Sequence, residues 1–217
     1  MTVRGLIHAH SRHSFDSLLP PSAFLEHARR RRLDFVCLTD HGTIAGSREL
    51  ARLNRNPGLE VVIGAEYATD RGDVIGLFLQ DEIHERRFDG VVDAIRQQRG
   101  LVLLPHPYRN HRLTDADWRL VDLVEIFNAR STAAANRAAF DDAVRHGIAQ
   151  TVGADIHTGW ELLRNGTFLS LLDDGQRDLR HLLLHARRSY TTRSSSRNLT
   201  RYSQVVKTAK RFLGRRR

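Results

Sequence analysis

Short apolar runs recur along the first two thirds of this chain, and polar segments with helical spacing separate them. The runs are rich in Val, Ile and Leu and are four to eight residues long, which is typical of strands buried on both faces. They predict strands near residues 3–8, 34–39, 60–65, 73–79, 101–105, 122–127 and 150–153.

The segments between these runs place apolar residues at helical spacing. Gly100 and Gly147 follow two of the segments and are suited to helix C-caps, while Thr114 and Asp117 resemble a capping box with Asp in place of Glu. Helices are expected over Ser22–Arg32, Phe88–Arg99, a short segment toward Trp118, Ala133–His146 and Arg177–Arg188, with an extra strand over Gly166–Leu172. Alternating strands and helices predict an α/β fold with a parallel sheet.

Side chains that can bind metals stand where the apolar runs end. His8 and His10 are two residues apart, so both leave the end of a strand on the same face. A lone His at a strand end is most often structural, but five ends of this kind favour a metal site with several ions. The ligand-type residues at the other four ends are Asp40 with His41, Glu66, His106, and Asp155 with His157.

The residue types narrow both the metal and the architecture. Imidazole and carboxylate ligands suit Zn, Mn or Fe(II), and the single thiol, Cys37, lies within a predicted strand. Chemistry at the C-terminal ends of many successive strands favours a closed barrel, because an open sheet concentrates its site at one switch point.

Composition sets further bounds. A chain of 217 residues with 41% hydrophobic residues fits one domain with a sizeable core. No apolar stretch approaches the roughly 20 residues of a membrane span. Met1 leads directly into the first predicted strand, and there is one cysteine, so we expect a cytoplasmic protein with no signal peptide and no transmembrane segment.

The net charge of +9 is unevenly distributed. Twelve of the 34 lysines and arginines follow Asp178, after which no acidic residue occurs. We therefore divide the chain into a barrel domain, residues 1–192, and a basic tail, residues 193–217, whose polar start we expect to be mobile. The tail carries a short amphipathic helix that could bind a polyanion, either nucleic acid or an anionic membrane surface, or could dock on the barrel. Its apolar residues are Val205, Val206, Ala209, Phe212 and Leu213.

Six motifs in order resemble the PHP (polymerase and histidinol phosphatase) superfamily, over roughly residues 3 to 160. They are His8-Ala9-His10, Ser14-Phe15-Asp16, Thr39-Asp40-His41-Gly42, Gly64-Ala65-Glu66, His106-Pro107 and Gly153-Ala154-Asp155-Ile156-His157. The resemblance implies a distorted (β/α)7 TIM-like barrel with two or three divalent metals at its C-terminal mouth. It also implies a phosphoesterase acting on nucleotides, oligonucleotides or small phosphorylated metabolites.

The resemblance also implies a set of metal ligands. Glu66 would bridge two ions, in keeping with the two oxygens that a carboxylate offers. By motif, one ion would be held by His8, His10 and Asp155, a second by Glu66 and His106, and a third by Asp16, His41 and His157.

The sequence departs from the family pattern at Asp73, where many relatives have a histidine. A second departure is that no histidine follows Glu125 at the distance some relatives show. The second ion would then be completed by Glu125, Asn128 or water.

Three further residues are candidates for binding substrate. Arg109 is placed to hold a phosphate with a bidentate fork, and Arg130 is a second candidate for that task. His13 could contact substrate or lie in an exposed loop. No Gly-x-Ser-x-Gly elbow is present, so we expect a metal-activated hydroxide to attack the phosphate mono- or diester, with Glu66 and Arg109 as catalytic groups. The alternative is a metal-binding scaffold or regulatory PHP module without turnover.

Overall fold

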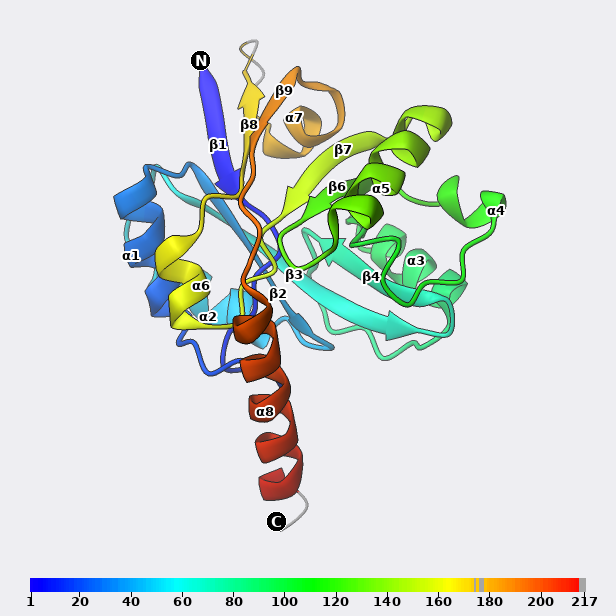
Figure 1. Cartoon of the computed structure of the whole chain (residues 1–217). Helices are drawn as coiled ribbons and strands as arrows, with labels where there is room; N and C mark the ends of the chain where they lie inside the picture. The colour runs from blue at the N-terminus through cyan, green and yellow to red at the C-terminus, as the bar shows by residue number, and fades with distance from the viewer. Residues whose placement is uncertain (174, 176–177, 215–217) are drawn as a thin grey trace.

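The computed structural model describes residues 1–173, 175 and 178–214, and a single curved sheet organises them (Figure 1). Within the described residues the sheet has nine strands in the order β7-β6-β5-β4-β3-β2-β1-β8-β9. The strands are β1 (Thr2–Leu6), β2 (Phe35–His41), β3 (Glu60–Thr69), β4 (Gly72–Leu77), β5 (Leu101–Leu104), β6 (Leu123–Asn128), β7 (Ala149–Gly153), β8 (Phe168–Leu172) and β9 (Arg188–Thr191).

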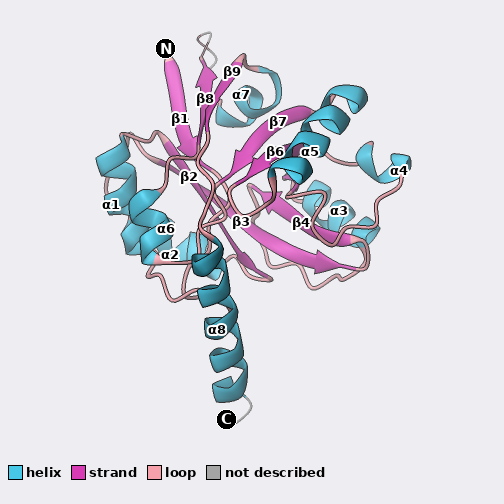
Figure 2. Cartoon of the chain, viewed as in Figure 1, coloured by secondary structure: helices cyan, strands magenta, loops and turns pink. Residues whose placement is uncertain are grey.

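Helices lie on the outside of this sheet, as Figure 2 shows. Two large buried side chains, Phe24 and Phe88, come from two of them and pack into the core. The helices are α1 (Ser22–Arg31), α2 (Ala45–Leu53), α3 (Phe88–Gln97), α4 (Asp115–Trp118), α5 (Ala133–His146), α6 (Gly159–Arg164), α7 (Leu179–His185) and α8 (Arg197–Gly214). The arrangement confirms the predicted α/β barrel.

The strands are not all parallel, which corrects part of the prediction. β1, β2 and β3 are parallel, as are β5, β6 and β7, but β4 is antiparallel to both of its neighbours and β8 is antiparallel to β1. A parallel crossover needs a dozen or more residues, and only Asp70 and Arg71 join β3 to β4. Gly72 supplies the backbone φ of +125° with which β4 begins.

The barrel closes beyond the ends of the first and last central strands. The chain after β1 pairs with the chain after β7 through a parallel bridge between Ala9 and Ile156. Two hydrogen bonds support this seam: His10 N donates to the Ile156 carbonyl at 2.8 Å, and Ala154 N donates to the Ile7 carbonyl at 3.0 Å. The seam is therefore made by the same two segments that carry four of the predicted ligands.

Helix α2 is an element that was not predicted from the sequence. It packs closely under the loop that follows β1. A Cβ on Gly46 would lie 1.9 Å from Asp40 Oδ2 and 2.5 Å from Ser11 Oγ, so only glycine allows this approach. Asp40 is held there by the backbone N–H and the hydroxyl of Ser11, at 2.5 and 2.7 Å.

The other predicted helices form with small changes in their limits. Thr114 and Asp117 make the predicted capping box of α4, and Gly147 ends α5 in the left-handed conformation. The helix expected over Arg177–Arg188 spans Leu179–His185, and Arg188 begins the unpredicted strand β9. Its expected start at Arg177 lies outside the described residues.

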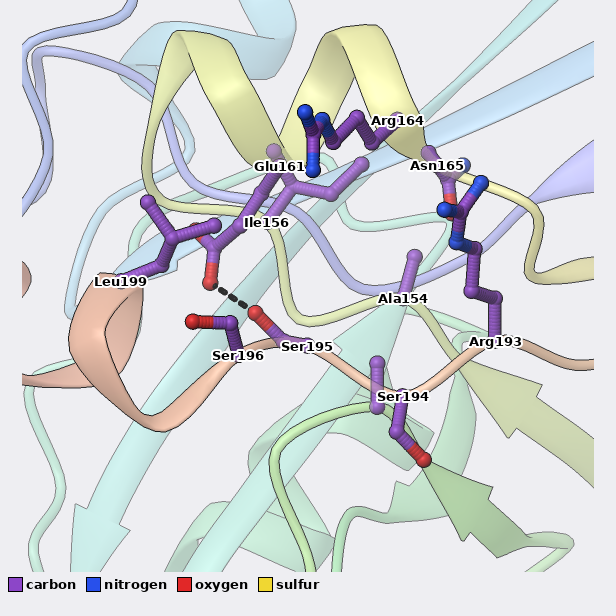
Figure 3. A pocket seen from close by; sticks show the side chains of 11 residues that line it. Ala154, Ile156, Glu161, Arg164, Asn165, Arg193, Ser194, Ser195, Ser196 and Leu199 are labelled. Atoms are coloured by element: carbon purple, nitrogen blue, oxygen red, sulfur yellow. Dashed lines mark hydrogen bonds between the residues drawn. The ribbon is translucent and has the colours of Figure 1, made fainter.

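The polar start of the tail is hydrogen-bonded to the barrel rather than free. Ser195 N donates to the Ala129 carbonyl at 2.6 Å, and Ser195 Oγ donates to Glu161 at 2.6 Å. Figure 3 shows this contact at a cavity of about 200 Å³ between α6, the segment 193–196 and the start of α8. In α8 the side chains of Ser203 and Val206 are buried, whereas Val205 and Phe212 are exposed. The side chain of Leu213 lies outside the described part.

Among the described residues, no helix is long and apolar enough to cross a membrane.

Candidate metal centre

The structure brings all eight predicted ligands together at one mouth of the barrel. Seven are buried and the eighth, His41, keeps 18% of its side chain exposed. They come from the ends of β1, β2, β5 and β7, from the middle of β3, and from the loop after β1. The eight form three overlapping groups whose ligand atoms lie within 4.8 Å of one another: His10, Asp16, His41 and His157; His8, Glu66 and His106; and His8, His10 and Asp155.

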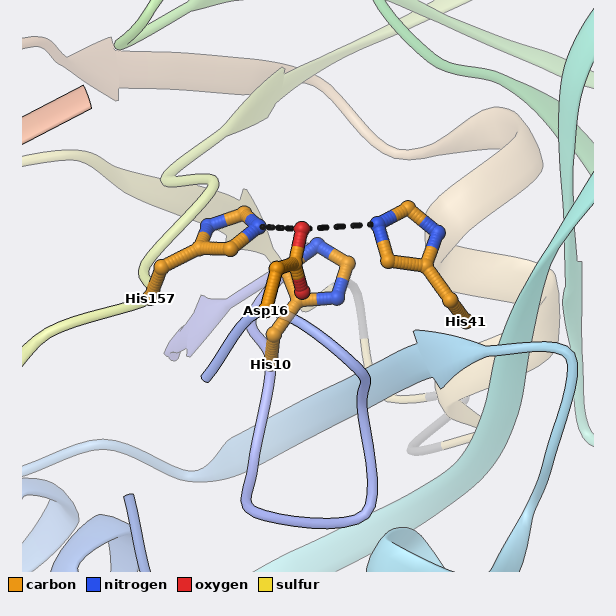
Figure 4. A group of neighbouring side chains, drawn as sticks. All are labelled: His10, Asp16, His41 and His157. Atoms are coloured by element: carbon orange, nitrogen blue, oxygen red, sulfur yellow. Dashed lines mark hydrogen bonds and ion pairs between the residues drawn. The ribbon is translucent and has the colours of Figure 1, made fainter. Parts of the chain in front are cut away.

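The first group is shown in Figure 4, where Asp16 stands between two imidazoles. Asp16 Oδ2 lies 3.1 Å from His157 Nε2 and 3.4 Å from His41 Nε2. The other carboxylate oxygen accepts a hydrogen bond from Ser14 Oγ at 2.9 Å, which fixes the orientation of the carboxylate. His10 completes the group from the end of the β1 segment.

Glu66 occupies the centre of the whole assembly. Its Oε1 lies 3.0 Å from His106 Nε2, and its Oε2 lies 3.3 Å from both His8 Nε2 and His41 Nδ1, and 3.4 Å from His10 Nε2. One carboxylate thus contacts four imidazoles, two from the segment after β1 and one each from the ends of β2 and β5. This position suits the bridging role that the family resemblance implies.

The charges of these groups are strongly coupled. Burial opposes ionisation of Glu66, but the neighbouring His8 and His41 outweigh burial and hold the pKa of Glu66 well below its usual value. Burial would lower the pKa of His41, yet Glu66 and Asp16 raise it to about 9. Burial and the nearby imidazoles of His157 and His41 lower the pKa of His10. Burial opposes ionisation of Asp155 too, but Arg109 and His8 outweigh it and hold the pKa of Asp155 well below its usual value.

The donor atoms fit a divalent cation. His8 Nε2 and His10 Nε2 face each other at 3.1 Å, and each lies 3.7 Å from Asp155 Oδ1. That oxygen is buried and has no hydrogen-bond partner among the described residues. A buried carboxylate oxygen without a donor is costly in a protein interior. A cation among these three side chains would satisfy it, and neutral imidazole and carboxylate are the ligand types that Zn, Mn and Fe(II) accept.

Three of the ligands have unusual backbone conformations. His8, His106 and Asp155 have φ angles of +65°, +30° and +48°. Positive φ is uncommon for residues other than glycine, and each case typically costs about 1–3 kcal/mol. All three directly follow strands or their extensions, so the backbone turns sharply there and aims each side chain into the mouth.

Glu125 has a role that the sequence analysis did not assign. It lies in the apolar strand β6, is buried, and accepts a hydrogen bond from His8 Nδ1 at 2.6 Å. Its other oxygen accepts from His106 N at 3.0 Å and from Asn128 Nδ2 at 2.9 Å. Glu125 therefore orients two candidate ligands, His8 and His106, and Asn128 in turn holds Glu125, whereas the sequence suggested both as ligands themselves. The sequence signal for this role was a carboxylate, Glu125, within an otherwise apolar strand.

The candidate substrate residues differ in their surroundings. Arg109 Nη2 donates to Asp155 Oδ2 at 2.7 Å, and its side chain is 34% exposed, so Arg109 reaches the metal-ligand cluster. The side chain of Arg130 is 5% exposed, and its guanidinium contacts Glu161 at 3.0 Å and Ser203 Oγ of α8 at 3.0 Å. His13 pairs with Glu49 at 2.7 Å and is 30% exposed.

A cavity of about 500 Å³ opens beside the ligands. His41 and Glu66 of the ligand set line it, together with Asp73 and Phe15. Burial and the charge of Glu66 raise the pKa of Asp73. His111, which the sequence analysis missed, stands nearby with its ring 5.6 Å from that of His106.

Comparison with known proteins identifies the family. The model of the PHP domain matches residues 7–209, which is nearly the whole chain. This chain belongs to the PHP domain family. The match includes all eight ligand positions and most of α8.

Individual proteins also resemble this chain in sequence or in fold. Two proteins of Methanocaldococcus jannaschii, MJ1587 and MJ0417, both named as uncharacterised, are 38% and 29% identical to this chain. The alignments cover 52% of this chain and 69% of MJ1587, and 95% of this chain and 98% of MJ0417. A two-domain Bacteroides vulgatus protein that contains a predicted PHP-like metal-dependent phosphoesterase shares the fold. Its TM-score is 0.73 at 16% identity, over 94% of this chain and 70% of that one.

Proposed function

We propose that this protein is a metal-dependent phosphoesterase that hydrolyses a phosphate mono- or diester of a nucleotide, oligonucleotide or small metabolite. The observation that carries the proposal is the cluster of eight His, Asp and Glu side chains around Glu66, beside a cavity that His41 and Glu66 line. Membership of the PHP family supports the same reaction class.

Two or three divalent ions, Zn, Mn or Fe, would be held by the three groups described above. When bound, such ions lower the pKa of a water to about 7 and neutralise charge on the phosphoryl oxygens. The remaining requirements fall to this chain's own side chains.

Arg109 is the group that would bind the phosphate being hydrolysed. Its guanidinium already lies against the ligand Asp155, and a third of its side chain is exposed, so it can donate to a non-bridging oxygen. Glu66 would hold negative charge at the centre of the cluster, since its pKa is well below the usual value. Arg130, the second candidate for binding phosphate, forms an ion pair with Glu161 and a hydrogen bond with Ser203, which join the barrel to α8.

The test combines metal analysis with a substrate screen. The protein would be stripped with a chelator, reloaded separately with Zn, Mn or Fe(II), and assayed against phosphomonoesters, phosphodiesters and short oligonucleotides. We expect hydrolysis that depends on added metal and is abolished in Arg109→Ala for at least one ester class. One tightly held ion and no turnover with any metal would instead show a non-catalytic metal-binding module.

A further inference from the structure

The C-terminal helix α8 is attached to the loop that carries the ligand Asp16. Lys210 Nζ donates to three backbone carbonyls of that loop, those of Arg12, Ser14 and Ser17, at 2.8, 2.6 and 2.7 Å. All three ammonium protons are therefore used, and partial burial lowers the pKa of Lys210. Such a contact fixes one side of α8 against the loop at a defined position.

One turn earlier in α8, Lys207 reaches the cavity beside the metal ligands. Its Nζ lies 4.8 Å from the centre of the Phe15 ring, and that ring stacks on His41 with 4.5 Å between centroids and 9° between planes. A continuous series of contacts thus runs from the tail helix to the candidate metal centre, through Lys207, Phe15 and His41.

The described residues include no ion-pair partner for the ammonium of Lys207. Glu66, Asp73 and Glu85 line the same cavity, but among the residues that the structure describes none of them forms an ion pair with the Lys207 ammonium. A cation–π contact with Phe15 stabilises the ammonium only modestly at a partly exposed site. The cavity therefore contains a partly buried ammonium that is free to bind an anion.

We propose that Lys207 binds a second anionic group of the substrate, distinct from the phosphate that is hydrolysed, and that Lys210 is the positioning residue that holds it there. This inference rests on the proposed phosphoesterase function. The reacting phosphate is provided for by the metal ligands and Arg109, whereas Lys207 is separated from the ligand cluster by the Phe15 ring. The substrate class is then an ester with a second negative charge some bonds away from the reacting phosphate.

Equilibrium binding of non-hydrolysable ligands tests this without any turnover. The probes are alkylphosphonates of increasing chain length and matched ω-carboxyalkylphosphonates, titrated into metal-loaded, full-length protein by calorimetry. At one chain length we expect the carboxylate to tighten binding about tenfold, the value for a charge-assisted hydrogen bond of about 1.4 kcal/mol. Lys207→Met should remove this preference and leave binding of the plain phosphonate unchanged.

A matched control is available on the same helix. Arg211 carries the same charge, lies exposed in the last turn of α8, and should be replaceable by Ala with the preference intact. Lys210→Met, which leaves Lys207 in place, should weaken the preference and speed proteolysis within α8, while circular dichroism reports on the barrel.

The outcomes separate the two proposals. If the plain phosphonate binds but no carboxylate preference exists at any chain length, or if Lys207→Met retains it, the role of Lys207 is refuted and the phosphoesterase proposal stands. If neither ligand binds to metal-loaded protein, both proposals fall together.

Discussion

Glu125→Gln is the most informative single change. It keeps the shape of a buried side chain but replaces one of its two hydrogen-bond acceptors by a donor. In the native protein one oxygen of Glu125 accepts from His8 Nδ1, and the other accepts from His106 N and Asn128 Nδ2. Glutamine offers one acceptor and one donor group. Whichever way its amide is turned, an N–H of glutamine faces a donor, either the His8 imidazole or the His106 backbone.

The magnitude follows from this mismatch. Removing a partner that orients a metal-binding imidazole typically lowers metal affinity 10–100-fold, which is about 1.4–2.7 kcal/mol. Two candidate ligands depend on Glu125, so we expect a loss at the upper end of that range, with a parallel loss of activity at limiting metal. Competition with a fluorescent chelator measures the affinity directly, and activity at saturating metal should recover in large part.

Glu49→Gln provides the control, since Glu49 also pairs with a histidine, His13 at 2.7 Å, but outside the ligand cluster. It should leave metal affinity unchanged. Equal metal affinity in wild type and Glu125→Gln would refute the orienting role of this carboxylate. A loss of affinity that matches that of Glu66→Gln would show that Glu125 is a ligand itself.

Three further predictions address the ligands and the stability of the fold. Replacing both His8 and His10 by Ala should lower metal affinity and activity by more than 100-fold, while far-UV circular dichroism stays native; retained metal would contradict the assignment. Glu66→Gln should reduce activity much more than Asp73→Ala, because the carboxylate of Glu66 contacts four imidazoles; equal losses would make Asp73 a ligand. Burial, with nearby arginines, lowers the pKa of His27 to about 4 from 6.5; the folded state thus favours the neutral ring, and stability present above pH 6.5 is lost as pH falls toward 4. Urea titrations should show a smaller loss over this range in His27→Gln, and identical pH dependence would contradict the assignment.

The strand pattern was predictable because most buried strands are continuous apolar runs, and those of β1, β2, β5 and β7 lead directly to ligand-type residues. The direction of β4 was not, since the apolar run 73–79 reads the same either way and only the brief Asp70-Arg71 connection indicates a hairpin. Helix α2 escaped for a related reason: it is fixed by the close approach of Gly46 to Asp40, a contact between residues of different elements.

The ligand positions could be predicted from residue type and order, but the hydrogen bonds that orient the ligands could not. The orienting bonds of Glu125 join β6 to β1 and to the residue after β5, and no local spacing encodes such a contact. The tail shows the same limit. Its composition allowed either a solvated arm or a docked helix, and the choice depends on Lys210 finding three carbonyls that only the folded loop brings together.

The closure of the barrel gives metal occupancy a mechanical consequence. The seam beside Ala9 and Ile156 is a single bridge with a few hydrogen bonds, yet His10 and His157 flank it from chain segments far apart in sequence. An ion shared by these two side chains would act as a removable cross-link that closes most of the barrel sequence into one loop. The entropy cost of forming such a loop grows only slowly with its length, and a ligand present at 100 times its Kd adds about 2.7 kcal/mol to folding. Removal of the ion by a chelator should then cause local unfolding at this seam first. Amide hydrogen exchange should accelerate at residues 7–10 and 154–157 before it does in the remaining strands.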